Sequence, residues 1–311
     1  RHLNTDHTEL YFSPKMAMNE IPNLPNIYDE PFSDNSQIPS ILLSRLAKNQ
    51  VKVALSGDGA DELFFGYNRY NYINNSFKNL NLLPNSLKKF LVKRIKLMSN
   101  ENWKKLFETL PFFKKYKNHR YKVKIMNILQ NQNLSELYFV LRSHWQNPEQ
   151  VVINSKEPDT FYNETDAELS NLSNFEKMMY FDQLTYMPND ILVKVDRASM
   201  ASSLETRIPF LNHKLIEYAW KIPNSLKFKN GKGKWILRKI LQNYVPENLI
   251  NRPKMGFGIP LDAWLRGPLR DWAENLLNET KLSQDGFLNT ELVRDKWKDF
   301  IINKGKWQYD L

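Results

Sequence analysis

The chain has 311 residues, and its 44 lysines and arginines outnumber its 34 acidic residues, which gives a net charge of +10. A hydrophobic content of 41% is that of a folded globular protein, and no apolar run reaches the 18 residues of a membrane-spanning helix. The length suits one large domain or two small ones. The absence of cysteine excludes disulfides and a cysteine nucleophile, and it agrees with a cytoplasmic location.

The positive charge has two interpretations. It could mark a surface for nucleic acid or another polyanion, or it could be spread over exposed helix faces. Lysines occur singly and in pairs and never in a block of five or six, which favours the second interpretation. We therefore expect neither a nucleic-acid nor a membrane partner. The five histidines show no metal-ligand spacing.

The first 66 residues predict a small α/β region. We expect a strand over 6–12, helical turns over 16–21, a helix over 38–48 and a short buried strand over 51–55. Strands that alternate with helices indicate a parallel sheet. The first 66 residues are therefore expected to hold the sheet of the protein.

Residues 67–311 predict a mainly helical region. Helical periods cover 87–97, 103–110, 134–145, 175–187 and 191–204. At the start of the last of these, Asp190 and Lys194 are spaced as an i, i+4 charge pair. The stretch 205–211 is expected to end that helix and turn. The loop 231–234, Gly-Lys-Gly-Lys, looks like a phosphate loop but lacks the Walker spacing.

The stretch that follows the strand 51–55 has the features of a nucleotide site. Small residues there let backbone N–H groups approach an anion at a helix start, namely Ser56, Gly57 and Gly59. Three carboxylates follow in the same stretch: Asp58, Asp61 and Glu62. They would repel a bare phosphate and make sense if a divalent cation or a positively charged reaction partner lies between. The pattern predicts metal-assisted nucleotide chemistry at the carboxyl end of a strand.

Four blocks of the chain, in order, resemble the synthetase domain of the glutamine-hydrolysing asparagine synthetases. They are residues 56–67, 192–200, 205–211 and 252–258. The resemblance runs from about residue 3 to the end, and the β-lactam synthetases share the fold. It implies an α/β core of the parallel-sheet, adenine-nucleotide α-hydrolase-like (PP-loop ATP pyrophosphatase) type, incomplete here, with a large, mostly helical remainder.

The resemblance also implies a reaction. A ligase of this family uses ATP and Mg²⁺ to adenylate the β-carboxylate of aspartate, which gives β-aspartyl-AMP and pyrophosphate. Ammonia, released from glutamine by a separate glutaminase domain, then displaces AMP and forms the carbon–nitrogen bond of asparagine. The implied partners are therefore aspartate and ammonia, and a homodimer is left open.

Two departures from the family matter. The glutaminase domain is absent from residues 1–311, and so is the Ser-Gly-Gly-x-Asp-Ser pyrophosphate loop of the synthetase domain. We therefore expect a synthetase domain shortened on its N-terminal side and inactive on its own.

By resemblance, the residues around the glycine turn take separate roles. The nucleotide is expected to contact Leu55, Ser56, Gly57 and Gly59, although the same residues also suit an ordinary tight turn. Asp61 is expected to hold Mg²⁺, or else to offset the helix dipole, which is the simpler role for Glu62. Asp58 is expected to accept a proton during amide formation, or else to bond within its own turn.

The remaining expected site residues lie elsewhere in the chain. Lys254 is expected to stabilise negative charge on the phosphate or on the adduct, although alone it would be a surface lysine. Aspartate recognition is expected from Asp190, Glu205 and Arg207, which could equally form a buried ion network, and from Asp34 and Ser36 in a loop.

Two other functions stay open. A near relative could amidate another carboxylate, as in polysaccharide or secondary-metabolite synthesis. A basic helical module that binds nucleic acid is the alternative from another class, and it would need lysines and arginines on one face with aromatic residues between them.

Overall fold

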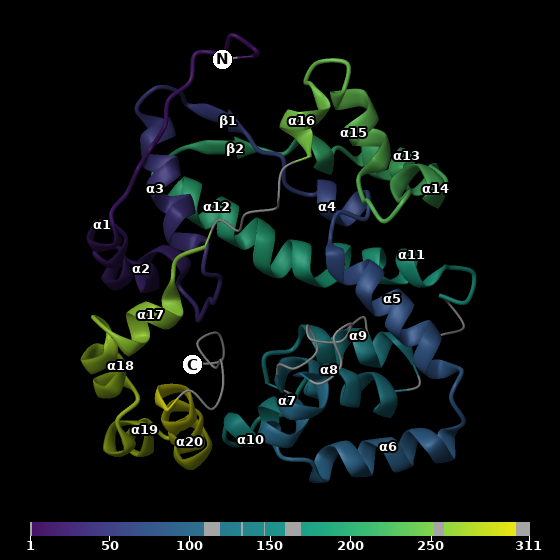
Figure 1. Cartoon of the computed structure of the whole chain (residues 1–311). Coiled ribbons are helices and arrows are strands. Elements are labelled where there is room, and N and C mark those ends of the chain that lie inside the picture. The colour runs from purple at the N-terminus through teal and green to yellow at the C-terminus, as the bar shows by residue number, and fades with distance from the viewer. Residues whose placement is uncertain are drawn as a thin grey trace. The chain divides into compact units, whose positions relative to one another are not determined.

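The computed structural model describes residues 2–108, 119–131, 133–145, 147–158, 169–251 and 258–302. The chain divides into two compact units. Unit 1 consists of residues 1–66, 147–158 and 183–311, and unit 2 of residues 67–146 and 159–182. The described residues are mostly helical and contain one two-stranded parallel sheet (Figure 1). None of the described helices combines the length and apolar character that a bilayer crossing requires.

The first part of unit 1 holds α1 (Pro14–Met18), a 3-10 turn (Ile21–Asn23), α2 (Leu24–Tyr28), α3 (Gln37–Lys48), β1 (Val53–Leu55) and α4 (Ala60–Leu63). Its later part holds α10 (Pro148–Val151), α12 (Val193–Met200), β2 (Glu205–Arg207), a 3-10 turn (Pro209–Leu211), α13 (His213–Lys221), α14 (Asn224–Lys227), α15 (Trp235–Leu241), α16 (Glu247–Ile250), α17 (Leu261–Arg266), α18 (Arg270–Leu276), α19 (Glu279–Asp285) and α20 (Thr290–Ile301).

The sheet pairs two segments that are far apart in the sequence. β1 lies parallel to β2, with Val53 opposite Glu205 and Leu55 opposite Arg207. The parallel arrangement confirms the prediction, but the second strand comes from a stretch that we expected to turn, and residues 6–12 form no strand. The expected burial of β1 is also wrong, because Leu55 is 74% exposed. The only strand that pairs with β1 among the described residues is the three-residue β2, so its other edge has no strand partner there.

The core of unit 1 packs helices beside the sheet. Tyr28 of α2, Ile41 of α3 and Ala198 of α12 form one buried cluster, which joins α3 to α12. A second cluster brings Ala17 of α1 and Trp264 of α17 onto the same helix α3. These contacts fix α3 and α12, and with them the loop that precedes α3.

A π-helix, Asp182–Leu192, leads into α12. It contains Pro188, which has no backbone N–H to donate to the turn before it. The wider turn avoids a regular hydrogen-bond ladder at that point, and π-turns of this kind often lie at functional sites. The predicted helices 175–187 and 191–204 are therefore one continuous helical stretch, residues 174–200, with an irregular middle and an end four residues earlier than predicted.

Unit 2 contains α5 (Asn68–Asn81), α6 (Asn85–Leu97), α7 (Asn100–Glu108), α8 (His119–Gln130), α9 (Leu134–Arg142) and α11 (Asn174–Phe181). Its core includes a polar network around the fully buried Asp182. Arg69 pairs with this carboxylate, and the Tyr70 hydroxyl donates to it at 2.5 Å. Burial raises the pKa of Tyr70 well above its ordinary value, so the phenol stays protonated as the donor.

Candidate nucleotide site

The turn after β1 leaves its backbone accessible. The Ser56 N–H continues the sheet by donating to the Arg207 carbonyl at 2.9 Å. Gly57 is exposed, and no atom outside its own neighbourhood lies within 4 Å of the place that a Cβ would take. A ligand can therefore approach the backbone of this turn closely, as a nucleotide site requires.

Gly59 starts α4 in a conformation that favours glycine. Its φ is +82°, in the left-handed region, and an added Cβ would lie 3.1 Å from the Leu211 Cδ2 atom. The residues after β2 thus pack against the start of α4. The side chain of Asp58, one residue earlier, accepts a hydrogen bond from the Ser56 hydroxyl, so the expected proton acceptor is held by its own turn.

Asp61, the expected metal ligand, pairs with a lysine that comes from a distant loop. The Lys234 Nζ atom lies 2.9 Å from the Asp61 Oδ2 atom, and the two side chains are 28% and 27% exposed. Lys234 belongs to the Gly-Lys-Gly-Lys loop that had too weak a motif to be assigned. Only its proximity to Asp61 identifies it, and no local pattern in the sequence could have done so.

Two glycines make room for this pair. A Cβ at Gly66 would lie 2.0 Å from the Asp61 Oδ1 atom and 2.4 Å from the Lys234 Cε atom. A Cβ at Gly233 would lie 1.8 Å from the Phe65 carbonyl oxygen. The Lys234 N–H donates to the Phe64 carbonyl at 2.7 Å, which ties the two loops together. The carboxylate and the ammonium are therefore held in place by backbone contacts.

Helix α4 is supported from its inner side. The Gln183 amide donates to the Glu62 carbonyl at 3.1 Å, and the indole of Trp220 donates to the Gln183 Oε1 atom at 3.1 Å. Glu62 itself is only 1% exposed. Glu62 lies in the first turn of α4, where an acid can offset the helix dipole, and its side chain is turned into the interior.

A second Asp–Lys pair lies in the loop before α3. The Asp34 Oδ2 atom is 2.9 Å from the Lys194 Nζ atom of α12, and the side chains are 12% and 11% exposed. Ser36 donates to the Asp34 Oδ1 atom from its N–H and its hydroxyl, each at 2.6 Å. Burial opposes ionisation, but the Ser36 hydrogen bonds and the charge of Lys194 hold the pKa of Asp34 below its ordinary value.

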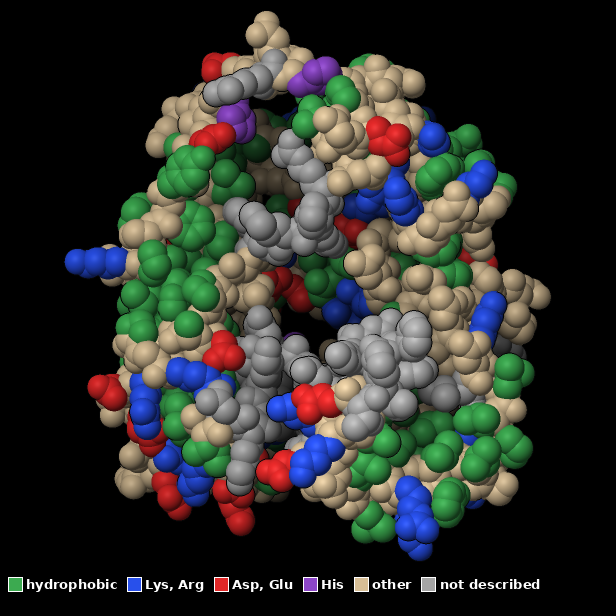
Figure 2. Space-filling view, in the orientation of Figure 1, with side chains coloured by type: hydrophobic (Ala, Val, Ile, Leu, Met, Phe, Trp, Pro, Cys, Tyr) green, Lys and Arg blue, Asp and Glu red, His purple; other side chains and the backbone are tan. Residues whose placement is uncertain are grey.

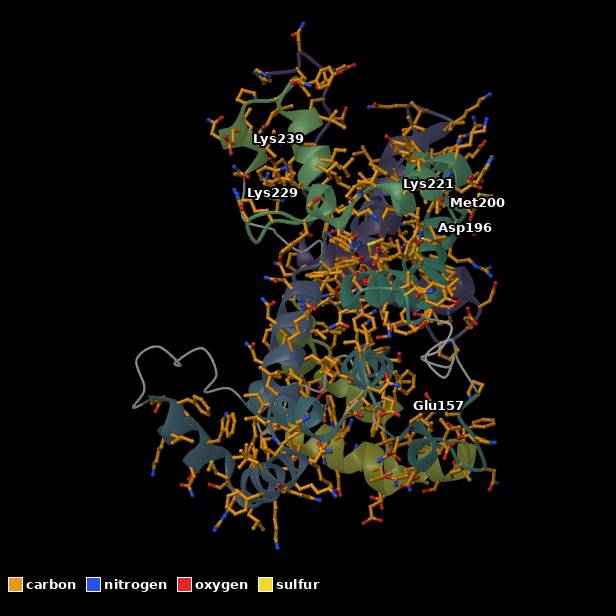
Figure 3. The ribbon with its side chains drawn as sticks, turned by 90° about the vertical axis from the view of Figure 1, so that its right-hand side faces the viewer. Glu157, Asp196, Met200, Lys221, Lys229 and Lys239 are labelled. Carbon is orange, nitrogen blue, oxygen red and sulfur yellow. The ribbon has the colours of Figure 1, made fainter. Side chains whose placement is uncertain are left out.

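Lys194 thus faces Asp34 and not the solvent. The opposite side of α12 carries Asp196 and Met200, which Figure 3 labels and which are both exposed. The sequence suggested Asp190 as the partner of Lys194 through the i, i+4 spacing, whereas the structure pairs Lys194 with a residue of another element. The reason is that Asp34 is preorganised by Ser36 at the base of α3.

The expected charge-stabilising residue, Lys254, lies outside the described residues. The chain is described again from Gly258, where it packs closely on the loop before α3. A Cβ at Gly258 would lie 2.5 Å from the Asn35 Nδ2 atom, and the Ile259 N–H donates to the Asn35 carbonyl at 3.2 Å. Gly258 is thus held against Asn35, the residue that follows Asp34.

The other expected substrate residues are not gathered in one place. Arg207 and Glu205 pair with each other at 2.6 Å on β2 and are 66% and 54% exposed. The alternative of a buried ion network is therefore wrong for these two, because residues i and i+2 of a strand share one face, and here that face is exposed. Asp190 lies half-buried in the π-helix.

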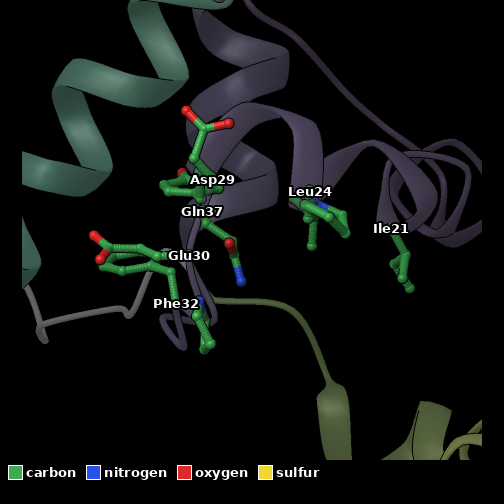
Figure 4. Close-up of a pocket in the computed structure, with 9 residues that line it drawn as sticks. Ile21, Leu24, Asp29, Glu30, Phe32 and Gln37 are labelled. Atoms are coloured by element: carbon green, nitrogen blue, oxygen red, sulfur yellow. The ribbon is translucent and has the colours of Figure 1, made fainter.

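A pocket of about 470 Å³ lies next to the Asp34 loop (Figure 4). Tyr28 and Phe32 stack in its wall with ring centroids 4.7 Å apart, and its remaining lining is mainly apolar. Asp29 and Glu30 also line it. Two carboxylates and an apolar wall do not suit an acceptor that carries its own carboxylates, so no aspartate site is assigned there.

The described residues fit MgATP in part. They contain no cluster of three histidine, cysteine or carboxylate side chains that could hold a metal alone. Mg²⁺ usually needs only one or two carboxylates when substrate phosphates supply the other ligands. Asp61, a partly exposed carboxylate beside a lysine near an open glycine turn, suits that shared role.

A parallel strand that leads into a glycine turn and an acidic helix start is the kind of arrangement that α/β nucleotide-binding proteins have at the carboxyl end of a strand. Comparison with known sequences agrees. The family described as asparagine synthase matches residues 1–311. This chain therefore belongs to the asparagine synthase family, whose adenine-nucleotide α-hydrolase-like fold accounts for the parallel strand pair.

Similar curated proteins include asparagine synthetase (glutamine-hydrolyzing) 1 of Bacillus subtilis (strain 168), which is 33% identical over 309 residues, 97% of this chain and 45% of the relative. A putative asparagine synthetase of Mycobacterium bovis is 32% identical over 260 residues, 81% of this chain and 37% of the relative. An amidase of Gibberella zeae is 32% identical over 127 residues, 39% of this chain and 19% of the relative. The chain thus spans less than half the length of these relatives.

Proposed function

We propose that this chain is the synthetase part of a cytoplasmic, ATP-dependent ligase that converts aspartate to asparagine. The single observation that carries the proposal is the Asp61–Lys234 pair at the end of an open glycine turn. Its charges are those that phosphate chemistry needs: an anion for a metal and a cation for a phosphate. The names of the relatives support asparagine as the product.

The nucleotide would lie along the turn. Leu55 offers an exposed apolar side chain for the adenosine, and the Ser56–Gly57 backbone offers N–H groups. Asp61 would share a Mg²⁺ ion with the phosphates, and this ion would neutralise charge that builds up on the leaving pyrophosphate. Lys234, released from Asp61, would then donate to a phosphate oxygen.

Amide formation needs groups that accept protons and stabilise an oxyanion. Ammonium must lose a proton before it attacks, and the tetrahedral adduct must lose another. Asp58 would accept them, because its carboxylate is already held at the turn by the Ser56 hydroxyl. Lys254 is proposed for the oxyanion, from the resemblance alone.

Fewer residues are proposed to contact the acceptor carboxylate substrate than the sequence suggested. Asp34 and Ser36 are engaged with Lys194, so we propose that they set the position of the loop beside the acceptor. Arg207, exposed at the end of β2, would bind an acceptor carboxylate, and Glu205 or Asp190 would bind the α-ammonium. Amidation of a different carboxylate is the second candidate, favoured by the similarity to an amidase.

The test measures pyrophosphate release from ATP in the complete gene product and in the 311-residue chain. We expect release to depend on aspartate in the complete product and to be absent from the 311-residue chain, which lacks the pyrophosphate loop. Release that depends on another carboxylate would select the second candidate. The absence of any carboxylate-dependent release from the complete product would overturn both.

A further inference from the structure

The positive charge of the chain is concentrated in unit 2. Unit 2, residues 67–146 and 159–182, contains 17 lysines and arginines and nine acidic residues, a net charge of +8, whereas the whole chain carries +10. The net positive charge is therefore unevenly divided between the two units. An uneven charge of this size attracts an extended anionic partner to one region.

Helix α6 presents a row of free lysines. Lys89, Lys93 and Lys96 are exposed and recur every three or four residues, so they lie on one face of the helix. In the part of the chain that the structure describes, none of the three forms a salt bridge. Their charges are thus available to a partner outside the protein.

An apolar row lies next to the lysines on the same exposed side. Leu87 is 40%, Phe90 53% and Leu97 76% exposed, and Leu82, just before the helix, is 83% exposed. With 3.6 residues per turn, Leu87, Phe90 and Leu97 fall on one stripe. Figure 2 shows hydrophobic and basic side chains together over the place of α6 in Figure 1. Exposed apolar side chains in such a row mark an interaction surface.

A groove between α6 and α8 adds a site for a head group. It has a volume of about 480 Å³ and is lined by Asn85, Lys88, Lys89, Val92, Lys93, Lys96, Leu129 and Gln130. None of these lining residues is acidic. Lys88 is only 5% exposed and brings a charge to the inner wall, while Val92 and Leu129 are apolar. A phosphate with an apolar chain attached matches this mixture of charge and apolar surface.

We propose that the outer face of α6 binds the surface of an anionic phospholipid membrane. Lysines on one stripe and leucine and phenylalanine on the next are the pattern of a helix that lies in the interface plane of a bilayer. The apolar side chains stand out from the helix and would enter the head-group boundary, while the lysines meet lipid phosphates. A nucleic acid would use the lysines but leave the leucines exposed to water, and so would an acidic peptide that paired with the lysines alone.

The experiment measures binding of the complete protein to vesicles of phosphatidylcholine with 30% phosphatidylglycerol and to vesicles of phosphatidylcholine alone. We expect at least about tenfold tighter binding to the anionic vesicles, and weaker binding as salt rises. The triple variant Lys89→Glu, Lys93→Glu, Lys96→Glu should bind at least about a hundredfold more weakly, since each lysine contributes roughly fivefold at an anionic surface. The double variant Leu87→Ser, Phe90→Ser should bind anionic vesicles about tenfold more weakly and keep the salt dependence of binding.

The matched control makes the same change of net charge elsewhere, with Lys15→Glu, Lys221→Glu and Lys281→Glu. Its affinity for anionic vesicles should fall by less than about fivefold. Because Phe90 is exposed, Phe90→Trp reports insertion directly through a blue shift of its fluorescence on vesicles. If the glutamate variant does not fold, as judged by circular dichroism, the glutamine variant replaces it. Equal loss in the control, equal binding to both vesicle types, or displacement of vesicles by single-stranded DNA or by an acidic helical peptide would overturn the proposal.

Discussion

Two Asp–Lys pairs of unit 1 have the same length and different surroundings. Asp61 and Lys234 are 2.9 Å apart, and so are Asp34 and Lys194. The first pair is more than a quarter exposed on both sides, whereas the second is 12% and 11% exposed, and Ser36 adds two hydrogen bonds to its carboxylate. The distance alone therefore does not say what an ion pair does.

The difference lies in what each pair can exchange. Asp61 and Lys234 are partly open to solvent. A metal ion could therefore take the place of the lysine ammonium beside Asp61, and a phosphate could take the place of the carboxylate beside Lys234. Asp34 and Lys194 are nearly closed to solvent, and separating them would leave a charge without a partner. We infer that the first pair serves the reaction and the second fixes the loop before α3.

The largest effect is expected from Asp61→Asn. Loss of the negative charge should reduce carboxylate-dependent pyrophosphate release by about a hundredfold or more, because the phosphates lose their shared metal ligand. The melting temperature should change little, since a partly exposed pair contributes under about 1 kcal/mol. Pyrophosphate release and thermal unfolding check this, with Glu279→Gln on α19 as the control. Near-normal release from the Asn variant would remove Asp61 from the site.

Lys194→Met should lower the free energy of unfolding by about 2–3 kcal/mol, because it leaves Asp34 nearly buried and unpaired. The matched change Lys234→Met should cost less than about 1 kcal/mol. Urea unfolding measures both. Adding Asp34→Asn to Lys194→Met should recover part of the loss. Equal losses for the two lysine variants would show that burial does not distinguish the pairs.

The buried Asp34–Lys194 pair should also make the free energy of unfolding depend on pH in the acid range. The pKa of Asp34 is held below its ordinary value in the folded chain, so its contribution is complete above about pH 4, the pKa range of an unfolded aspartate. As the pH falls, the unfolded chain takes up the proton first, and stability is lost until the folded pKa is passed. Urea midpoints from pH 6 to pH 3 should fall less steeply in Asp34→Asn. An unchanged slope would contradict the assignment.

The smallest effect is expected at β2. Arg207→Gln should change the free energy of unfolding by no more than about 0.5 kcal/mol, because Arg207 and Glu205 pair in solvent. If Arg207 binds the acceptor, its loss raises the KM for aspartate and leaves the KM for ATP unchanged. An equal rise in both would remove its assignment to the acceptor.

The sequence predicted correctly those elements whose structure is decided by interactions between residues close together in the chain. The helical character of 87–97 and of most of 134–145, and the glycine turn at 56–59, depend on near neighbours. The strand expected at 6–12 does not form, because strand character alone supplies no partner. β2 escaped prediction because three residues give too short a pattern.

The partners at the site could not be predicted in the same way. Lys234 meets Asp61 only when α15 packs beside α4, and Lys194 meets Asp34 only when α12 packs on α3. Spacing along the chain favoured Asp190 for Lys194, but Asp34 offers a carboxylate that two hydrogen bonds have already oriented. Tertiary packing decides between partners that sequence distance ranks in the opposite order.

The glycines at 66 and 233 have a consequence for how such chains can change through descent. Any side chain at Gly66 would collide with Asp61 and Lys234, and any side chain at Gly233 would collide with the Phe65 carbonyl. Neither glycine can be replaced while the Asp61–Lys234 pair is kept. We therefore expect related sequences to retain the two glycines together with the aspartate and the lysine. Relatives that have lost the lysine should still keep Gly233, because its collision is with the backbone of residue 65 and not with the lysine side chain.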